Sequence, residues 1–320
     1  MTEDSAQKFD FGKISVTAKL VAFFRGFSDI PFASEVAELI GAEDAVRKIV
    51  EKSDIDIMPR PRSAADLSET VDEKHYQRRA QISDGDIYAP LFEARYKSIA
   101  ELIRQSGLRQ VLELASGFSL RGLAMTSDPN LVYVESDLQE LNSEKRELVR
   151  SIRAKFNLPD LGNHHLADAN ALSLSDLEGL IDCFSIDEKL IVVTEGLLMY
   201  LSVEERARVA ENVYSLLKRF GGGAWITPDF TTRSLADNVP DAVKRFRSAI
   251  LGRTERQLFE SAFENETEME RFFSSMGFRS ECENQMDVVK KLSCVEALDI
   301  NQAILDRLRP RMNLWTLKPS

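Results

Sequence analysis

A strand that runs into a turn of small residues is the segment of this chain with the clearest chemical use. A strand with apolar Val111, Leu112 and Leu114 leads into the small residues 115–117, which are Ala, Ser and Gly, and a helical stretch follows. Small residues let the backbone approach a ligand closely, with N–H groups free to donate hydrogen bonds. Asp137 follows the next apolar strand, 20 positions after Gly117, where a carboxylate commonly binds ribose hydroxyls. The spacing therefore predicts a site for a ligand that carries a ribose.

A second candidate group is a single carboxylate at the end of another apolar strand. Residues 189–194 form a largely apolar run that ends at Glu195, and a second apolar run follows it. A carboxylate between two apolar runs is costly to bury unless a cation or a hydrogen-bond donor faces it. Ser202 and Glu205 then have the spacing of a capping box, which predicts a helix directly after Ser202. We therefore expect a charged or hydrogen-bonding partner at Glu195.

The segment Glu195-Gly-Leu-Leu-Met-Tyr-Leu resembles the strand-four signature of a known family. This is the leucine carboxyl methyltransferase and polyketide O-methyltransferase family of class I S-adenosylmethionine (SAM) enzymes. Three further segments are similar to the same family: the opening stretch from Lys19 to Pro31, the segment Ala94-Arg95-Tyr96, and the pair Asp168-Ala169. The resemblance covers most of the chain, and it implies that SAM is the cofactor.

The resemblance also implies roles for individual residues. Arg95 and Lys19 would bind the methionine carboxylate of SAM, and Glu195 would bind its ammonium group. Asp137 would accept hydrogen bonds from the ribose diol. Asp168 would accept from the adenine amine, and the backbone of Ala169 would donate to a ring nitrogen. The expected cofactor-binding residues are Lys19, Arg95, Glu113, Ala115, Gly117, Asp137, Asp168, Ala169 and Glu195.

Four of these nine assignments have an ordinary structural alternative. These alternatives are a helix cap for Asp137, a loop position for Asp168, an ion pair with Glu93 or Glu101 for Arg95, and a solvated helix position for Lys19.

The glycine turn departs from the family pattern, which often has Gly-x-Gly followed by Asp or Gly. Ala115 replaces one glycine, and Ser119 stands at the later position. These departures leave a non-catalytic SAM-binding protein as an alternative. An NAD-linked oxidoreductase is disfavoured, because Leu120 stands where a dinucleotide fingerprint needs a glycine.

Composition excludes several other classes of protein. The 320 residues carry a formal net charge of −11, which disfavours a nucleic-acid partner because such partners are bound by basic patches. The longest apolar stretch is interrupted by Glu195, and the N-terminal residues lack a signal-peptide pattern, so we expect no membrane partner. Cys183, Cys282 and Cys294 are too widely spaced to suggest a zinc site or a disulfide framework. We expect a cytoplasmic enzyme without a metal, and its oligomeric state stays open.

Hydrophobic periodicity divides the chain into two parts. Residues 1–105 show helical patterns at 33–50 and 99–105, which predicts a helical cap that contributes to the cofactor and substrate site. From residue 106, strands alternate with helices. The expected strands are 111–114, 131–134, 164–166, 190–194, 224–227, 277–280 and 313–317, and the expected helices are 138–156, 174–183, 203–219 and 266–275. Residues 232–262 would form an inserted helical lid.

Together with the resemblance, this pattern predicts an α/β fold. Residues 106–320 would form the SAM-binding domain, with a Rossmann-like, seven-stranded class I methyltransferase sheet whose last strand is antiparallel, and residues 1–105 would form the N-terminal helical cap.

The cofactor that the resemblance implies also limits the chemistry. A sulfonium methyl group is already electrophilic, so the enzyme needs to align the reactants and exclude water. Tyr200 is the one catalytic candidate that the motif offers, although packing against the sheet explains its ring better. An ionised carboxylate acceptor needs no general base, whereas an aliphatic hydroxyl does. We therefore expect the partner to be a small-molecule methyl acceptor of polyketide type, methylated at a carboxylate or an acidic hydroxyl. Methylation of a protein C-terminal carboxylate is the alternative.

Overall fold

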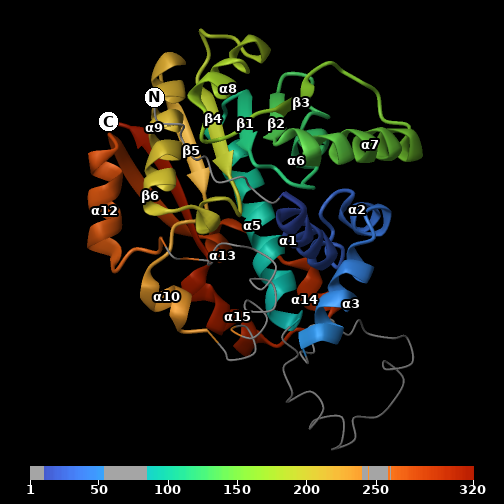
Figure 1. The fold of residues 1–320 in the computed structure, drawn as a ribbon. Coiled ribbons are helices and arrows are strands. Elements are labelled where there is room, and N and C mark those ends of the chain that lie inside the picture. The colour runs from blue at the N-terminus through green and yellow to red at the C-terminus, as the bar shows by residue number, and fades with distance from the viewer. Residues whose placement is uncertain (1–10, 54–84, 240–243, 245–258, 260) are drawn as a thin grey trace, which may run out of the picture.

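The computed structural model describes residues 11–53, 85–239, 244, 259 and 261–320. Seven strands form one sheet in the order β3-β2-β1-β4-β5-β7-β6 (Figure 1). They are β1 (Gln110–Leu114), β2 (Val132–Asp137), β3 (His164–Asp168), β4 (Leu190–Thr194), β5 (Gly223–Thr227), β6 (Phe278–Asn284) and β7 (Asn313–Pro319). Only β7 runs antiparallel to its neighbours, β5 and β6. The predicted seven-stranded sheet with an antiparallel last strand is therefore confirmed.

Four parallel strands end at the same edge of the sheet. Leu114 at the end of β1 pairs with Ser136 of β2 and with Thr194 of β4, and Asp137 pairs with Asp168 of β3. The turns that follow these strands therefore leave the sheet side by side. Because β1 and β4 are neighbours although two strands separate them in the chain, the strand order reverses here. Open α/β sheets bind their ligands at this kind of position.

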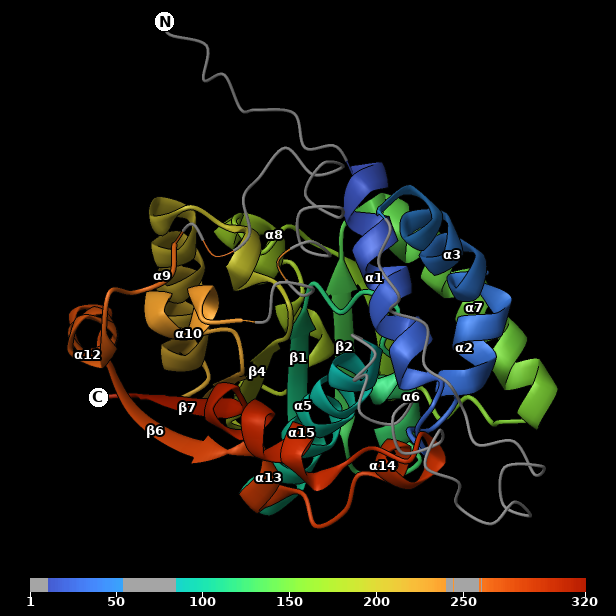
Figure 2. The same ribbon diagram turned by 90° about the horizontal axis from the view of Figure 1, so that it is seen from below.

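Helices cover both faces of the sheet (Figure 2), and alternate side chains of the central strands pack against them. Leu112 and Leu114 belong to a core shared with α8 (Leu174–Glu178) and α9 (Val203–Arg219). Val111 instead packs with the last turns of α5 (Gly85–Ser106). Burial on both faces explains why these strands are continuous apolar runs in the sequence. The helix predicted at 203–219 is confirmed as α9, and its capping box is formed by Ser202 and Glu205.

The N-terminal helices lie beside α7 (Gln139–Phe156), at one end of the sheet (Figure 1). They are α1 (Phe11–Arg25), α2 (Ala33–Leu39) and α3 (Ala42–Ser53). The expectation of one continuous helix over residues 33–50 is wrong, because Gly41 has a φ of 61° and separates α2 from α3. A left-handed residue ends a helix, and glycine adopts this conformation readily.

Helix α5 is much longer than the helix expected over residues 99–105. It begins at Gly85 and includes Pro90, so Ala94-Arg95-Tyr96 lies inside this helix rather than before it. Tyr88 and Phe92 are buried against α1 and the C-terminal helices. This tertiary packing compensates for the backbone hydrogen bond that a proline inside a helix cannot donate.

The remaining helices surround this core. The expected helix 174–183 is divided into α8 and the short 3₁₀ turn η1 (Ile181–Cys183), with Gly179 as the C-cap of α8. The other elements are α6 (Arg121–Met125), η2 (Leu198–Tyr200), α10 (Arg233–Asp237), α12 (Glu266–Ser275), α13 (Gln285–Val288), α14 (Ser293–Ala297), α15 (Gln302–Leu308) and η3 (Arg309–Arg311). Of the expected lid, the structure describes α10 and the residues next to it, and most of 240–260 lies outside the described residues. No helix in the described part of the chain combines the length and apolar character needed to cross a bilayer.

Candidate functional site

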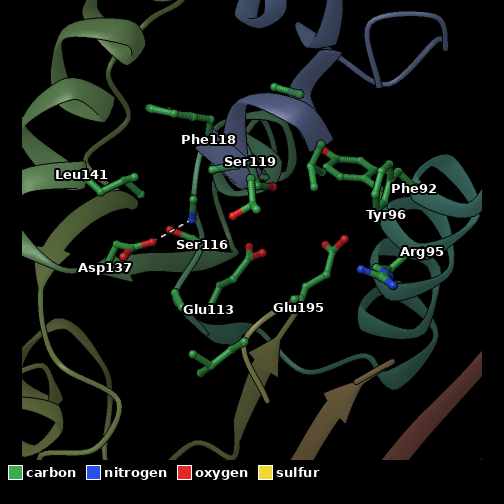
Figure 3. Close-up of a pocket in the computed structure, with 18 of the residues that line it drawn as sticks. Phe92, Arg95, Tyr96, Glu113, Ser116, Phe118, Ser119, Asp137, Leu141 and Glu195 are labelled. Carbon is green, nitrogen blue, oxygen red and sulfur yellow. Dashed lines mark hydrogen bonds between the residues drawn. The ribbon is translucent and has the colours of Figure 1, made fainter. Parts of the chain in front are cut away.

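A cavity of about 560 Å³ opens where β1, β2 and β4 end. Its volume is typical of a small-molecule site. Figure 3 shows Asp137 on one side of this cavity and Arg95 on the opposite side, with Glu113 and Glu195 between them. Seven of the nine expected cofactor residues line it: Arg95, Glu113, Ala115, Gly117, Asp137, Ala169 and Glu195. Lys19 and Asp168 are not among the described lining residues.

The turn after β1 has a glycine-like backbone in spite of its alanine. Ala115 has a φ of 52° and Gly117 a φ of 53°, both in the left-handed region. This conformation is routine for glycine, whereas it costs other residues about 1–2 kcal/mol. Ser116 donates its backbone N–H to the oxygen of Ser136 at 3.0 Å, and its hydroxyl lies 2.8 Å from the buried ammonium group of Lys145. These contacts hold Ala115 in the conformation that a glycine would adopt.

Asp137 is bound to the glycine turn from the end of β2. One carboxylate oxygen accepts from the backbone N–H of Gly117 at 2.8 Å, and the other accepts from that of Leu138 at 2.8 Å (Figure 3). Burial raises the pKa of Asp137, although both hydrogen bonds lower it. The N-cap of α7 is Leu138, without a side-chain hydrogen bond, so Asp137 is not the N-cap residue. Each oxygen has a further lone pair that can accept from a ligand hydroxyl.

Glu195 lies between two guanidinium groups. One oxygen pairs with Arg25, and the other lies 2.5 Å from a nitrogen of Arg121. Burial raises the pKa of Glu195, but the charges of Arg25 and Arg121 outweigh burial and hold this pKa below its ordinary value. The expectation that a cation faces this buried carboxylate is confirmed, and the protein itself provides the cations.

Arg121 connects the ends of β1 and β4. Its side chain is fully buried, and its second guanidinium nitrogen lies 2.5 Å from Glu113. The other oxygen of Glu113 accepts from the Tyr133 hydroxyl at 2.6 Å. Burial lowers the pKa of Arg121, but Glu113 and Glu195 raise it well above the ordinary value. Arg121 is not among the residues expected from the sequence, because nothing in the chain order shows that two carboxylates from different strands meet there.

Arg25 is the basic residue that α1 presents to the cavity. Ala18, Ala22 and Arg25 are spaced by four and three residues, which places them on one face of a helix, and all three line the cavity. Lys19 is six positions from Arg25 and therefore lies on a different side of α1. A Cβ added to Gly117 would lie 3.8 Å from the Cβ of Ala18, so the same face of α1 covers the glycine turn. This helical spacing is a signal by which Arg25 could have been found in the sequence.

Arg95 lies on the side of the cavity opposite Asp137 (Figure 3). Its expected structural alternatives do not occur among the described residues. Glu93 instead binds Lys97 and accepts from the backbone N–H of Ser293, and Glu101 pairs with Arg104. The Nε of Arg95 is buried and has no hydrogen-bond partner in the described part of the chain. Arg95 can therefore bind an anion that enters the cavity.

Asp168 and Ala169, which the resemblance assigns to adenine, make hydrogen bonds with other protein groups in this structure. The Asp168 carboxylate lies 3.0 Å from the side-chain nitrogen of Asn142 and 2.6 Å from a nitrogen of Arg146. Ala169 lines the cavity, but its backbone N–H donates to the oxygen of Asp137 at 2.9 Å. Contacts of Asp168 and Ala169 with adenine therefore stay predictions.

Comparison with known proteins identifies the family. A model of the leucine carboxyl methyltransferase family matches residues 34–214, which is more than half of the chain. The chain belongs to the leucine carboxyl methyltransferase family. It is thus a SAM-dependent methyltransferase. A comparison with curated protein sequences finds no match.

Several solved methyltransferase structures are similar to this family member at low sequence identity. A protein from Nostoc punctiforme is 14% identical over 97% of this chain and 95% of that chain, with a TM-score of 0.47. An O-methyltransferase family protein from Burkholderia thailandensis has the same identity and coverages and a TM-score of 0.45. Magnesium protoporphyrin IX methyltransferase from Synechocystis, solved with bound SAH, is 11% identical over 88% of this chain and 95% of that chain, with a TM-score of 0.45.

Tyr200 of this methyltransferase also lines the cavity, at the end of η2. Burial raises the pKa of its hydroxyl, although a hydrogen bond with Thr17 of α1 lowers it. Tyr200 therefore stays neutral near pH 7 and is unsuited to act as a general base.

Proposed function

We propose that this methyltransferase binds SAM in the 560 Å³ cavity, with the ribose at Asp137 and the methionine end toward Glu195 and Arg95. The residues present fit the cofactor. Asp137 has lone pairs for a diol, and Arg95 offers a guanidinium group without a partner carboxylate among the described residues. When bound, SAM supplies a methyl group on a positively charged sulfur.

The described lining of the cavity holds no group placed to act as a general base, and this observation carries the proposal. Glu113 and Glu195 are each paired with Arg121, and Asp137 accepts from two backbone N–H groups. Tyr200 is protonated near pH 7, because burial raises its pKa. An acceptor that is already ionised therefore fits this cavity best.

A carboxylate acceptor suits a cavity whose described lining holds no evident base. It is ionised at pH 7, so a new oxygen–carbon bond can form without removal of a proton. The roles left to the protein are to orient the acceptor and to exclude water. Leu20, Leu91 and Met199 line the cavity and can surround an apolar body. We therefore infer O-methylation of a small metabolite that joins a carboxylate, or an acidic hydroxyl, to an apolar skeleton of polyketide type.

Binding and product chemistry test this function. Calorimetric titration should detect binding of SAM and of its product S-adenosylhomocysteine (SAH). It should detect no binding of NAD. The enzyme is then incubated with methyl-labelled SAM and three acceptor groups: apolar carboxylic acids, phenols, and peptides with a free C-terminal carboxylate. Methyl esters release labelled methanol in mild alkali, whereas methyl ethers do not. Label transfer to the peptides alone would favour protein C-terminal methylation instead, and NAD binding without SAM binding would refute the proposal.

The N-terminal helices form part of the same proposal. Arg25 and Ala18 of α1 line the cavity beside Glu195 and Gly117, so we propose that residues 1–105 act as a cap of the cofactor and substrate site in a cytoplasmic enzyme. Removal of residues 1–60, and separately Arg25→Met in the full chain, should both weaken SAH binding. Unchanged SAH affinity in a folded truncated protein would show that the cap is a separate module.

A further inference from the structure

Asp229, just after β5, holds the turn that follows Glu195. Its side chain accepts hydrogen bonds from three successive backbone N–H groups. These belong to Gly196 at 2.8 Å, Leu197 at 2.8 Å and Leu198 at 3.0 Å. Asp229 is only 5% exposed, so water replaces these contacts poorly. Hydrogen bonds from a backbone to a buried carboxylate are stronger than neutral ones.

The turn that Asp229 holds forms one wall of the cavity. Gly196, Leu197, Met199 and Tyr200 line the cavity, whereas Asp229 is not among its described lining residues. Gly196 has a φ of 75°, so the chain bends sharply directly after Glu195. Asp229 is itself fixed to β5, because its backbone N–H donates to the Thr227 hydroxyl at 3.2 Å. Asp229 thus links the end of β5 to the wall of the site on β4.

We propose that Asp229 is a positioning residue that fixes Glu195 and the cavity wall for cofactor binding without touching the cofactor. A buried carboxylate is costly, and an apolar side chain could fill the same space without that cost. Two of the three N–H donors, Gly196 and Leu197, line the cavity, and this gives the carboxylate a specific use. The inference rests on the proposed location of SAM and is independent of the proposed acceptor.

Asn163 provides a matched control at the opposite end of the sheet, directly before β3. Its side chain is 7% exposed, and its amide donates to three backbone oxygens. These belong to Thr126 at 3.1 Å, Asp128 at 2.9 Å and Leu131 at 2.9 Å. Asp229 and Asn163 are therefore similar in burial and in number of backbone contacts, but only Asp229 contacts the cavity wall.

The experiment exchanges a carboxylate and an amide at each position, as Asp229→Asn and Asn163→Asp. Asp229→Asn places an amide N–H group against a backbone N–H group, and Asn163→Asp places a carboxylate oxygen against backbone oxygens. Both variants should therefore unfold at a lower temperature than the wild type. SAH affinity is then measured by calorimetry at a temperature where all three proteins are folded. We expect Asp229→Asn to weaken SAH binding about tenfold, because small displacements of site residues have large effects. Asn163→Asp should leave SAH affinity unchanged.

Thr227→Val is the milder second variant. It removes the hydroxyl that accepts from the backbone of Asp229, and we expect about threefold weaker SAH binding. Wild-type affinity in both Asp229→Asn and Thr227→Val would overturn the inference, as would equal weakening in Asn163→Asp. A wild-type protein that does not bind SAH would refute the cofactor site itself, which is a different result from equal binding by wild type and variants.

Discussion

The two ends of the cavity are built in different ways. At the Asp137 end, the contacts join segments that are close in sequence: the turn at residues 115–117 and the end of β2. At the Arg95 end, charged side chains from four elements meet. Arg25 belongs to α1, Arg95 to α5 and Arg121 to α6, and all three lie around Glu195 at the end of β4. One end therefore depends on backbone geometry, and the other depends on buried charge.

This difference separates two requirements of the site. Backbone N–H groups and one carboxylate suffice to recognise a ribose, because its hydroxyl groups are neutral. A charged methionine end and an anionic acceptor instead need opposite charges that are held apart inside a site of low dielectric constant. The larger energies, and the larger effects of substitution, are therefore expected at the Arg95 end.

Arg121→Met should have the largest effect on stability. It leaves the buried carboxylates of Glu113 and Glu195 without the cation between them. Removing one member of a buried ion pair typically costs 3–5 kcal/mol, so we expect the free energy of unfolding to fall by about that amount. Urea unfolding measures it. The control is Arg104→Met, which removes an exposed pair with Glu101 and should cost less than about 0.5 kcal/mol. Equal effects of the two changes would contradict a dominant role for the buried charges.

Glu135 allows a test of buried charge next to the Asp137 end of the cavity. Lys145 contacts both Glu135 and Ser116, which belongs to the glycine turn. Glu135 lies 3.2 Å from Lys145 and 3.0 Å from His164. Burial raises the pKa of Glu135, but Lys145 and His164 outweigh it and lower this pKa to about 2. Because the folded-state pKa is depressed, this stabilisation is complete above the unfolded pKa of about 4.3 and is lost as the pH falls toward 2.

We expect wild-type protein to lose on the order of 3 kcal/mol of unfolding free energy through Glu135 over this pH range. Glu135→Gln lacks this group, so its stability should be lower at pH 7 and should approach that of the wild type in acid. Urea unfolding between pH 7 and pH 3 measures the difference, which should shrink by about half of this amount by pH 3. A difference that stays constant with pH would show that Glu135 is not held ionised by its neighbours.

Most of the sheet and half of the site could be predicted from the sequence. β4 and α9 match their expected limits, because apolar runs and a capping box are local signals. Asp137 was found by its spacing from Gly117. Arg25 and Arg121 were missed, because their partners are distant in the chain and become neighbours only when the sheet forms. The start of α5 was missed for the same reason, since packing in the core extends this helix beyond Pro90.

Asp137→Ala and Glu195→Gln compare the two ends by cofactor affinity. Asp137→Ala removes the proposed ribose acceptor and leaves the charges around Glu195 in place. Glu195→Gln replaces a charged hydrogen-bond acceptor with a neutral one, so Arg25 and Arg121 lose their carboxylate partner at this position. We expect both to weaken SAM binding by about 1.5–3 kcal/mol in calorimetric titrations, the cost of losing hydrogen bonds to a charged group, with Glu195→Gln nearer the upper limit of this range. Asp128→Ala, in an exposed turn, is the control. If both variants bind SAM like the wild type, the proposed orientation of the cofactor is wrong.

Ala115→Gly should have the smallest effect and the opposite sign. The left-handed backbone of Ala115 costs about 1–2 kcal/mol, and glycine avoids this cost. Glycine also gives the unfolded chain more freedom, which offsets about 0.4–1 kcal/mol of the gain. A net stabilisation of roughly 0.5 kcal/mol should therefore appear as a higher unfolding temperature. SAH affinity should not change, because Ser116 and Asp137 already hold the turn in this shape. A lower unfolding temperature would mean that the alanine methyl group contributes packing that exceeds its strain, and tighter SAH binding would mean that the alanine distorts the Asp137 end of the cavity.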